Sequence, residues 1–460
     1  MEVTTTKGVD IMLGDPKKAI MAFSIPIAVA LLAQQSNSLV DSFWVTGLGG
    51  NAMAALGLLS PIYSVLVGLG SGLGIGTSAA IARNIGMGNG EKAGGIASQS
   101  LILCVLIGLI ATPLLLLTAR PVLVAIGAGP TIDASMEFAV PLYICCTLIF
   151  MSGVMSGILR GEGAVRRSMY IQVIGAISNL ILDPILIYNM HMGVAGAAWA
   201  TSISFVISIL IGAYWYLVQK DMFIKFKKKD LRWNTAYQRE ILSVGLPQSA
   251  EFTVMSLFNV TFNFCVIMVG GTDLMAIYTV AWRIMYILLI PPQALGGAIV
   301  SLCSAEFGMK RYDMIRQAYL FSVKISIALL AVLAVAMCLM AGPIASVFTV
   351  APDMQYLHHD MMVMLYIFAA FVPIMSLIYV GSSLLQALRR SKISLISTFI
   401  RNAMLAITFL IAAYWVGTFT SLWWALFITE VFGGMLSGYW AYVMLKDAAK
   451  RDGKSLLAET

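Results

Sequence analysis

The sequence predicts an all-α membrane protein whose twelve transmembrane helices form two pseudo-symmetric six-helix lobes. Three observations indicate this fold class. Hydrophobic residues make up 60% of the 460 residues, and charged residues only 11%. Apolar runs of about 20 residues, long enough to cross a bilayer, recur along the whole chain. The pattern of the first half returns in the second half, as in proteins built from internal repeats. This composition leaves no room for a soluble domain.

Polar breaks divide the apolar runs into twelve expected spans. The spans cover residues 18–46, 53–82, 95–118, 134–159, 168–190, 195–218, 240–269, 274–303, 315–341, 357–387, 393–415 and 420–445. Each holds enough apolar residues to cross the hydrocarbon core, and the first is also expected to act as the membrane-targeting signal.

The basic residues predict the orientation of these spans. Loops after even-numbered spans are rich in lysine and arginine, as at Arg166 and Arg167, and both tails are basic, whereas the opposite loops contain only Arg120. The positive-inside rule therefore places both termini in the cytoplasm of a multi-pass protein of the cell membrane. The net charge of +7 then reflects topology and contact with anionic membrane lipids. No nucleic-acid partner is expected, because the charge is spread over many loops.

The most charged internal loop separates two similar halves. We expect an N-lobe at residues 1–218, a cytoplasmic inter-lobe loop at 219–239 and a C-lobe at 240–460. At an offset of about 221 to 226 residues, Trp199 of the first half meets Trp424 of the second. An even number of spans per half gives a parallel repeat, which places a cavity between two bundles. A cavity that can open to either side favours a transporter over a channel or an enzyme.

The first span contains an unusual polar stripe within "QQSNSLVDSF", residues 34 to 43. The stripe consists of Gln34 and the residues three, four and seven positions after it, which are Asn37, Ser38 and Asp41. This spacing places all four on one face of a helix. Gln34, Asn37 and Ser38 are candidates for lining the substrate cavity. Asp41 has no acidic counterpart in the second half, which indicates a functional rather than a structural need for it.

A second acidic residue is expected at the same depth. Asp183 lies about 22 Å into the fifth span, as Asp41 does in the first. The sixth span runs back from the outer side of the membrane and brings Thr201 to the same depth. Asn179 shares a helix face with Asp183, and Pro184 frees a backbone carbonyl nearby. These oxygens form a candidate site for a cation or a proton. The alternative is that the two acids only hydrogen-bond neighbouring helices.

Several motifs carry a family resemblance that covers nearly the whole chain. "VDSFWVTGLG" at 40–49, "GILRGEGAVRRSM" at 157–169, "NLILDPILIY" at 179–188 and "GAAWATS" at 196–202 resemble the multidrug and toxic compound extrusion (MATE) family, in particular its archaeal DinF-like branch. The resemblance implies a V of two lobes and secondary active efflux of amphipathic, often cationic small molecules in exchange for H⁺ or Na⁺. It implies no other cofactor, and a monomer is expected.

The same resemblance assigns roles to single residues. Pro26 would be the bending point of the first helix, and Asp41, Asn179, Asp183 and Thr201 would form the cation and proton site of the N-lobe. The chain departs from the branch at Asn37-Ser38, where Tyr-Asn is common, and at Ala164, where an acidic residue is usual. It also has Met255 where the NorM-like branch has its glutamate. Substrate preference is therefore open.

Four charged residues are expected inside the C-lobe. Glu251 and Arg283 both fall near the middle of the membrane, and so do Arg401 and Glu430. Each pair can be a structural ion pair or can take part in substrate binding, and the sequence leaves both possibilities open.

Other features are not expected to bind ligands. No metal site is predicted, because His191, His358 and His359 fall in expected external loops and all six cysteines lie in apolar segments. The glycine run at 68–76 indicates close helix packing rather than a phosphate-binding loop. An intramembrane enzyme would need catalytic constellations that the spans lack. A lipid-linked oligosaccharide flippase of the same superfamily would need several basic residues in the cavity, for which Arg283 and Arg401 are the obvious candidates.

Overall fold

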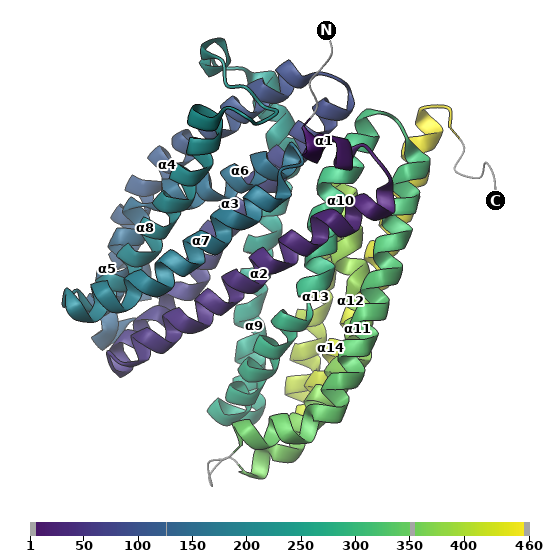
Figure 1. The fold of residues 1–460 in the computed structure, drawn as a ribbon. Helices are drawn as coiled ribbons and strands as arrows, with labels where there is room; N and C mark the ends of the chain where they lie inside the picture. The colour runs from purple at the N-terminus through teal and green to yellow at the C-terminus, as the bar shows by residue number, and fades with distance from the viewer. Residues whose placement is uncertain (1–5, 126, 350–354, 455–460) are drawn as a thin grey trace. The chain divides into compact units, whose positions relative to one another are not determined.

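All regular secondary structure is helical in the part of the chain that the computed structural model describes, residues 6–125, 127–349 and 355–454 (Figure 1). Ten helices are long and apolar enough to cross a membrane. A further span is obtained if α5 (Ile132–Ile144) and α6 (Cys146–Gly161), which are bent by 51°, are counted together. The 54 residues of α9 (Thr235–Leu288) are broken at Gly271, where φ is 65° and ψ is −159°. An unbroken helix of that length would extend about 80 Å, far beyond a bilayer, so α9 contributes two spans. The described chain therefore confirms the twelve predicted spans.

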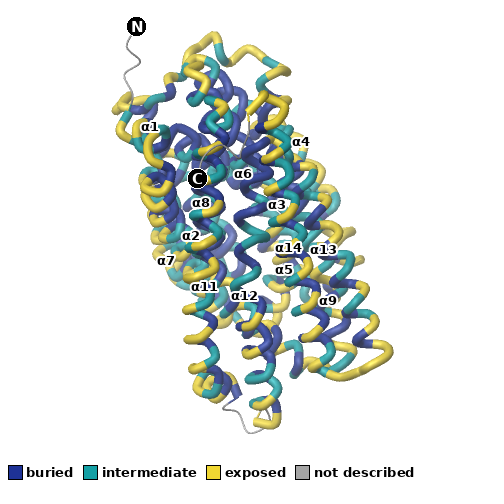
Figure 2. The backbone as a smooth tube through the Cα atoms, turned by 90° about the vertical axis from the view of Figure 1, so that its right-hand side faces the viewer, coloured by how far each residue is buried: buried dark blue, intermediate teal, exposed yellow. Residues whose placement is uncertain are grey.

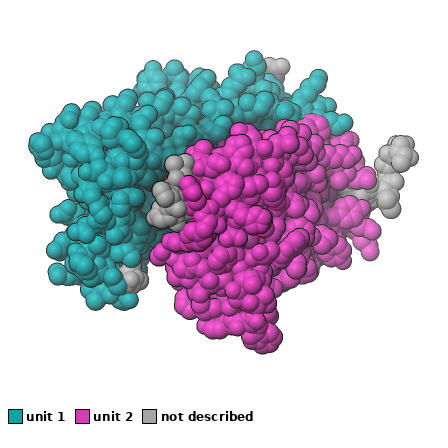
Figure 3. All heavy atoms as spheres, turned by 90° about the horizontal axis from the view of Figure 1, so that it is seen from below, with its two compact units in different colours: residues 1–252, 304–309 teal, residues 253–303, 310–460 magenta. Residues whose placement is uncertain are grey.

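The chain divides into two compact units, shown in different colours in Figure 3. Unit 1 contains residues 1–252 and 304–309, and unit 2 contains 253–303 and 310–460. The division lies inside α9 rather than at the inter-lobe loop, so the first turns of α9 belong to unit 1.

The helices of the two units follow in chain order. Besides α5 and α6, unit 1 contains α1 (Lys7–Met12), α2 (Pro16–Thr46), α3 (Gly50–Gly86), α4 (Gly90–Ala125), α7 (Val165–Pro184) and α8 (Gly193–Tyr214). Unit 2 contains the later part of α9, most of α10 (Ile290–Gly308), α11 (Tyr312–Phe348), α12 (His358–Ala387), α13 (Ser391–Ile411) and α14 (Phe419–Arg451). Short 3₁₀ or π-helical turns are η1 (Gly129–Thr131), η2 (Ile185–Asn189), η3 (Trp215–Gln219), η4 (Lys228–Leu231), η5 (Gln355–Leu357) and η6 (Ala412–Val416).

Glycines bring α3 and α6 into backbone contact at the centre of unit 1. A Cβ on Gly153 would lie 2.5 Å from the carbonyl oxygen of Gly70, and one on Gly157 would lie 2.7 Å from the carbonyl carbon of Gly74. Helices with small residues four apart can approach this closely in a membrane. The close packing expected from the glycine run is therefore present, and the second half of α6 is almost entirely buried (Figure 2).

The internal repeat is visible in matching side-chain contacts. In unit 1 the hydroxyls of Ser156 and Ser168 are 2.7 Å apart, and in unit 2 those of Ser382 and Ser394 are 2.6 Å apart. The helices that carry the second serine of each pair, α7 and α13, both continue into π-helical turns, η2 and η6. The two halves thus repeat local structure as well as hydropathy.

Large apolar side chains cover the outside of the helices. On α4, Leu109, Ile110 and Leu117 are exposed, and on α11 so are Val332 and Leu339. Contiguous exposed apolar residues of this kind are typical of a lipid-facing surface. The protein is therefore a multi-pass membrane protein.

The segment between α8 and α9 is anchored to unit 1. The carboxylate of Glu162, just beyond the end of α6, accepts hydrogen bonds from the hydroxyl of Tyr216 and from the backbone N–H of Ile224, the latter at 2.9 Å. The side chain of Gln99 donates to the carbonyl oxygens of Asp230 and Arg232 at 2.8 and 2.7 Å. The inter-lobe loop is therefore part of the folded unit.

Glu162 predicts a pH dependence of stability. Burial raises the pKa of this carboxyl from 4.5 to about 7, although its two hydrogen-bond donors favour the ionised form. The resulting stabilisation, up to about 3 kcal/mol, is fully present below the unfolded pKa and is lost as pH rises through the folded pKa. We expect the thermal midpoint of the wild type to fall more steeply between about pH 5 and about pH 8 than that of Glu162→Gln. Parallel slopes for the two proteins would contradict this assignment.

Candidate cation-coupling site

Helices α2 and α7 of unit 1 lie against each other and carry the polar residues expected to bind a cation. The helix α2 begins at Pro16, where the side chain of Asp15 caps it by accepting from the backbone N–H of Lys18 at 2.9 Å. At its other end, the hydroxyl of Tyr188 donates to the carbonyl oxygen of Trp44 at 2.6 Å. The bond from Tyr188 to Trp44 helps to fix the position of α2 relative to the end of α7, near the acidic residues.

A hydrogen-bonded chain of amides and carboxylates connects the two helices. The Nδ2 of Asn37 donates to Oδ1 of Asn179 at 2.6 Å and lies 3.3 Å from Oδ2 of Asp41. The Nδ2 of Asn179 in turn donates to Oδ1 of Asp183 at 3.3 Å. The carboxyl groups of Asp41 and Asp183 also face each other. The structure thus brings together three of the four predicted coupling residues and adds Asn37 to them.

Two acceptor atoms in this cluster have no donor. Oδ2 of Asp183 and Oδ1 of Asn37 are buried and accept no hydrogen bond within the described part of the chain. Asp183 and Asn179 are themselves only 1% and 2% exposed. Buried acceptors without a donor are unfavourable unless a proton or a cation lies among them. The oxygen-rich donor set suits a hard cation, and the facing carboxyl groups can equally share a proton.

The other predicted residues of unit 1 lie differently. The Thr201 hydroxyl donates to the carbonyl oxygen of Ala197 in its own helix at 3.1 Å, and among the described residues it has no hydrogen bond to the acidic cluster. Gln34 and Ser38 are exposed on α2, whereas Asn37 is half-buried against α7. Sequence spacing placed Asn37 with Gln34 and Ser38 as a cavity residue. Its link to the coupling cluster depends on the position of α7, which spacing within one helix does not reveal.

The segment after Asp183 deviates from an ordinary helix. The helix α7 ends at Pro184 and continues as the π-helical turn η2. Proline has no N–H to donate, so the regular hydrogen-bond pattern is interrupted one residue after the carboxylate. Such turns often occur at functional sites in helices.

The sequence matches the MatE family over residues 26–185 and 247–412. The chain belongs to the MatE family. Two curated relatives are a FAD transporter of Shewanella oneidensis, 24% identical over 92% of this chain and 94% of its own length, and the multidrug export protein MepA of Staphylococcus haemolyticus, 25% identical over 74% of this chain and 75% of its own.

A solved structure described as the outward-facing conformation of a multidrug resistance MATE family transporter of the MOP superfamily is 32% identical to this chain, with a TM-score of 0.93 over 97% of this chain and 100% of its own. The family assignment confirms the resemblance seen in the motifs. It also confirms that this MatE protein is a transporter and not an enzyme.

Of the four charged residues predicted inside the C-lobe, Arg401 and Glu430 form a close pair. Nη1 of Arg401 on α13 donates to both carboxylate oxygens of Glu430 on α14, at 2.7 and 2.8 Å. Both side chains are buried within unit 2. Glu251 belongs to unit 1 and Arg283 to unit 2, so their pairing in this MatE protein stays a prediction.

The histidines of this MatE protein lie partly outside the loops in which the sequence placed them. His358 and His359 form the first turn of α12, because the 3₁₀ turn η5 leads directly into that helix. Nε2 of His358 lies 3.2 Å from Oγ of Ser346. Within the described ranges, no group of three or more His, Cys, Asp or Glu side chains could hold a metal ion.

Proposed function

We propose that this MatE protein exports amphipathic, often cationic small molecules from the cell in exchange for H⁺ or Na⁺. Family membership and the multidrug exporters among its relatives support multidrug efflux. The two donor-less oxygens beside the carboxylates of Asp41 and Asp183 carry the coupling part of the proposal. A proton on the Asp183 carboxyl, or Na⁺ beside it, would satisfy the buried carboxylate oxygen, and Oδ1 of Asn37 is a further acceptor on the same cluster.

Thr201 is the remaining member of the proposed coupling site. Its hydroxyl oxygen has spare acceptor capacity, because the hydroxyl only donates to Ala197. We assign this oxygen to the coupling site as a further ligand for a bound Na⁺. Gln34 and Ser38, exposed on α2, are the residues we assign to substrate contact.

Pro26 provides a mechanical link between the coupling site and the rest of α2. The helix is continuous from Pro16 to Thr46, yet Pro26 cannot donate to the carbonyl oxygen of Ala22. Bending at this point costs less than elsewhere in the helix. A change of the hydrogen bonds around Asp41 on protonation or cation binding can therefore shift α2 between two shapes of similar energy.

Replacing Pro26 by Ala should lower turnover while substrate still binds. The added N–H completes the helical hydrogen bond and favours the straight form by roughly 1 kcal/mol or more. We expect at least a fivefold fall in efflux rate, with dye affinity changed less than twofold. Fluorescence binding and liposome efflux measured on the same preparation test this, and unchanged turnover would refute a hinge at Pro26.

The proposed location is the cell membrane, with both termini in the cytoplasm and a monomer as the functional form. The distribution of basic residues in the tails and in alternate loops supports this orientation. Anionic headgroups would interact with these loops, which makes membrane lipids constant partners.

Transport by the purified protein in liposomes tests the proposal directly. A pH gradient and a Na⁺ gradient are imposed separately, with ethidium as the cationic probe and FAD as an anionic one. Gradient-driven ethidium transport supports multidrug antiport. Transport of FAD alone would favour a flavin carrier like the relative from Shewanella, and absence of any gradient dependence would reject antiport.

A lipid-linked oligosaccharide flippase is not favoured. That function would need basic side chains available in the cavity, and Arg401 is buried against Glu430. The described unit 2 therefore offers one less cationic group to a phosphorylated lipid than the sequence suggested.

A further inference from the structure

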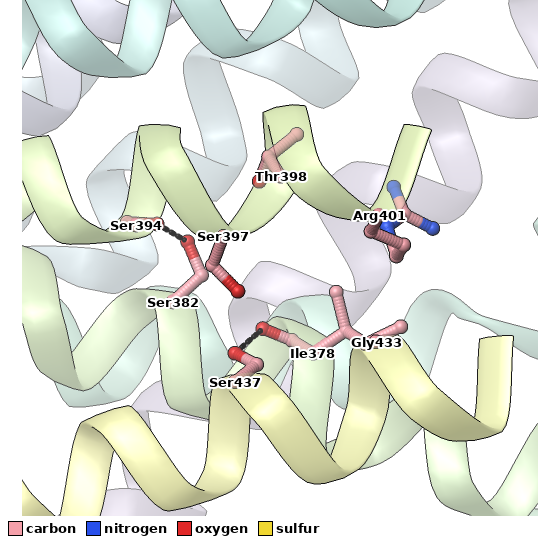
Figure 4. A pocket seen from close by; sticks show the side chains of 8 residues that line it. All are labelled: Ile378, Ser382, Ser394, Ser397, Thr398, Arg401, Gly433 and Ser437. Atoms are coloured by element: carbon pink, nitrogen blue, oxygen red, sulfur yellow. Dashed lines mark hydrogen bonds between the residues drawn. The ribbon is translucent and has the colours of Figure 1, made fainter. Parts of the chain in front are cut away.

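A small polar cavity with about 10 Å³ of free volume lies inside unit 2, between α12, α13 and α14 (Figure 4). Five hydroxyl side chains line it: Ser382, Ser394, Ser397, Thr398 and Ser437. Ser397 is only 6% exposed, its hydroxyl points into the cavity, and within the described chain it has no hydrogen-bond partner. The free space is enough for about one water molecule or one small ion.

The Arg401 side chain forms one end of this cavity and leads to Glu430. Glu430 is 1% exposed and lies about 16 Å along α14, near the middle of the bilayer. The methylene groups of Arg401 cross α14 at Gly433, where a Cβ would lie 2.6 Å from Cγ of the arginine. The glycine thus makes room for the arginine, whose guanidinium neutralises the carboxylate through the two hydrogen bonds given above.

In the internal repeat, the position of this arginine corresponds to a glycine of unit 1. Arg401 follows the paired Ser394 by two helical turns, as Gly175 follows the paired Ser168. Unit 1 instead has two carboxyl groups that face each other, Asp41 on α2 and Asp183 on α7, and Oδ2 of Asp183 lacks a donor. In unit 2, both oxygens of the Glu430 carboxylate accept hydrogen bonds from Arg401, a cation that is part of the chain itself.

We propose that Arg401 is a tethered counter-cation that occupies the place of an exchangeable coupling ion, so that Glu430 takes up neither Na⁺ nor a proton during transport. This inference rests on the proposed function of the cluster in unit 1 as the exchanging site. Unit 2 then contributes no coupling ion, and each protein molecule couples transport through unit 1 alone.

The surroundings of Glu430 are consistent with this role. Tyr278 from α9 and Tyr379 from α12 are close enough to Glu430 to be affected by its charge. Tyrosines are uncharged near neutral pH, so Arg401 is the group that balances the carboxylate. Removing Arg401 would leave Glu430 beside a cavity lined by hydroxyl oxygens, which suits a small hard cation. A fixed ion pair would thereby become an exchangeable site.

The test compares ion-dependent stability in Arg401→Met and in the double variant Arg401→Met/Glu430→Gln. All proteins also carry Asp41→Asn, which weakens ion binding in unit 1, and Asp41→Asn alone is the parent protein of the comparison. Thermal unfolding in detergent is followed with a thiol-reactive dye, because Cys265 and Cys303 of unit 2 are fully buried until the unit opens. Choline replaces Na⁺ at constant ionic strength.

We expect Na⁺ at about 100 mM, or a fall to about pH 5, to raise the midpoint of Arg401→Met by roughly 5 °C relative to the parent. The double variant should recover most of the lost stability and lose this ion dependence, since no carboxylate remains to be neutralised. A Na⁺ effect in the parent that Glu430→Gln abolishes would overturn the proposal. So would a folded Arg401→Met protein without any ion dependence.

A failure of Arg401→Met to fold also gives an answer. In that case the yield of folded double variant decides, because removing the carboxylate should rescue folding if neutralising Glu430 is what Arg401 does. No rescue would overturn the proposal. Failure of the coupling site in unit 1 would instead appear as full gradient-driven efflux by Asp41→Asn, which leaves these thermal comparisons unchanged.

Discussion

Asp41→Asn is expected to reduce ion-coupled efflux about 100-fold or more, to the level of liposomes without protein. The asparagine keeps the shape of the side chain and can still interact with Asn37, which lies 3.3 Å from Oδ2 of Asp41. It cannot carry a proton in exchange or supply a negative charge to Na⁺. The loss should therefore appear in transport driven by either gradient, with expression and thermal midpoint close to the wild type.

A matched control separates coupling from general loss of charge. Asp133 is exposed in the first turn of α5, and Asp133→Asn should transport as the wild type does. Retained gradient-driven efflux by Asp41→Asn would remove Asp41 from the coupling site. Loss of folded protein in that variant would instead show that the carboxylate has a structural role.

Glu240→Gln is expected to lower the stability of unit 1 by about 3 kcal/mol or more. Oε1 of Glu240 accepts from Nη2 of Arg83 at 2.6 Å and from Nδ2 of Asn84 at 3.0 Å, and Oε2 lies 3.2 Å from Nζ of Lys92. Arg83 is only 4% exposed. Loss of the carboxylate removes the negative charge that Glu240 supplies to two nearby cations, one of them buried. A fall of the thermal midpoint by about 5 °C or more is expected.

The two exposed ion pairs of Glu91, with Lys227 and with Lys229, supply the control. Like Glu240→Gln, Glu91→Gln removes a carboxylate that contacts two cations. The Glu91 side chain is exposed to solvent, where an ion pair contributes little to stability. Its midpoint should match the wild type. Equal midpoints for Glu240→Gln and Glu91→Gln would show that burial of the Arg83 cluster does not matter.

The sequence by itself determined the spans, their repeat and the depth of the acidic residues. Hydropathy and helical spacing are local properties, so twelve apolar runs predicted twelve spans, and counting residues brought Asp41 and Asp183 to the same level. The predicted gap between the spans 240–269 and 274–303 coincides with the break at Gly271, where φ is 65°.

Only the tertiary structure decided which polar side chains meet. The bond from Asn37 to Asn179, the pair of Arg401 with Glu430 and the contact of Glu240 with Arg83 each join different helices. Such contacts depend on how each helix is rotated and shifted against its neighbour, and one residue of shift turns a side chain by about 100° around the helix axis. Hydropathy is almost unchanged by such a shift, because lipid accepts any apolar face, so the packing of small residues and the pairing of buried polar groups select the register.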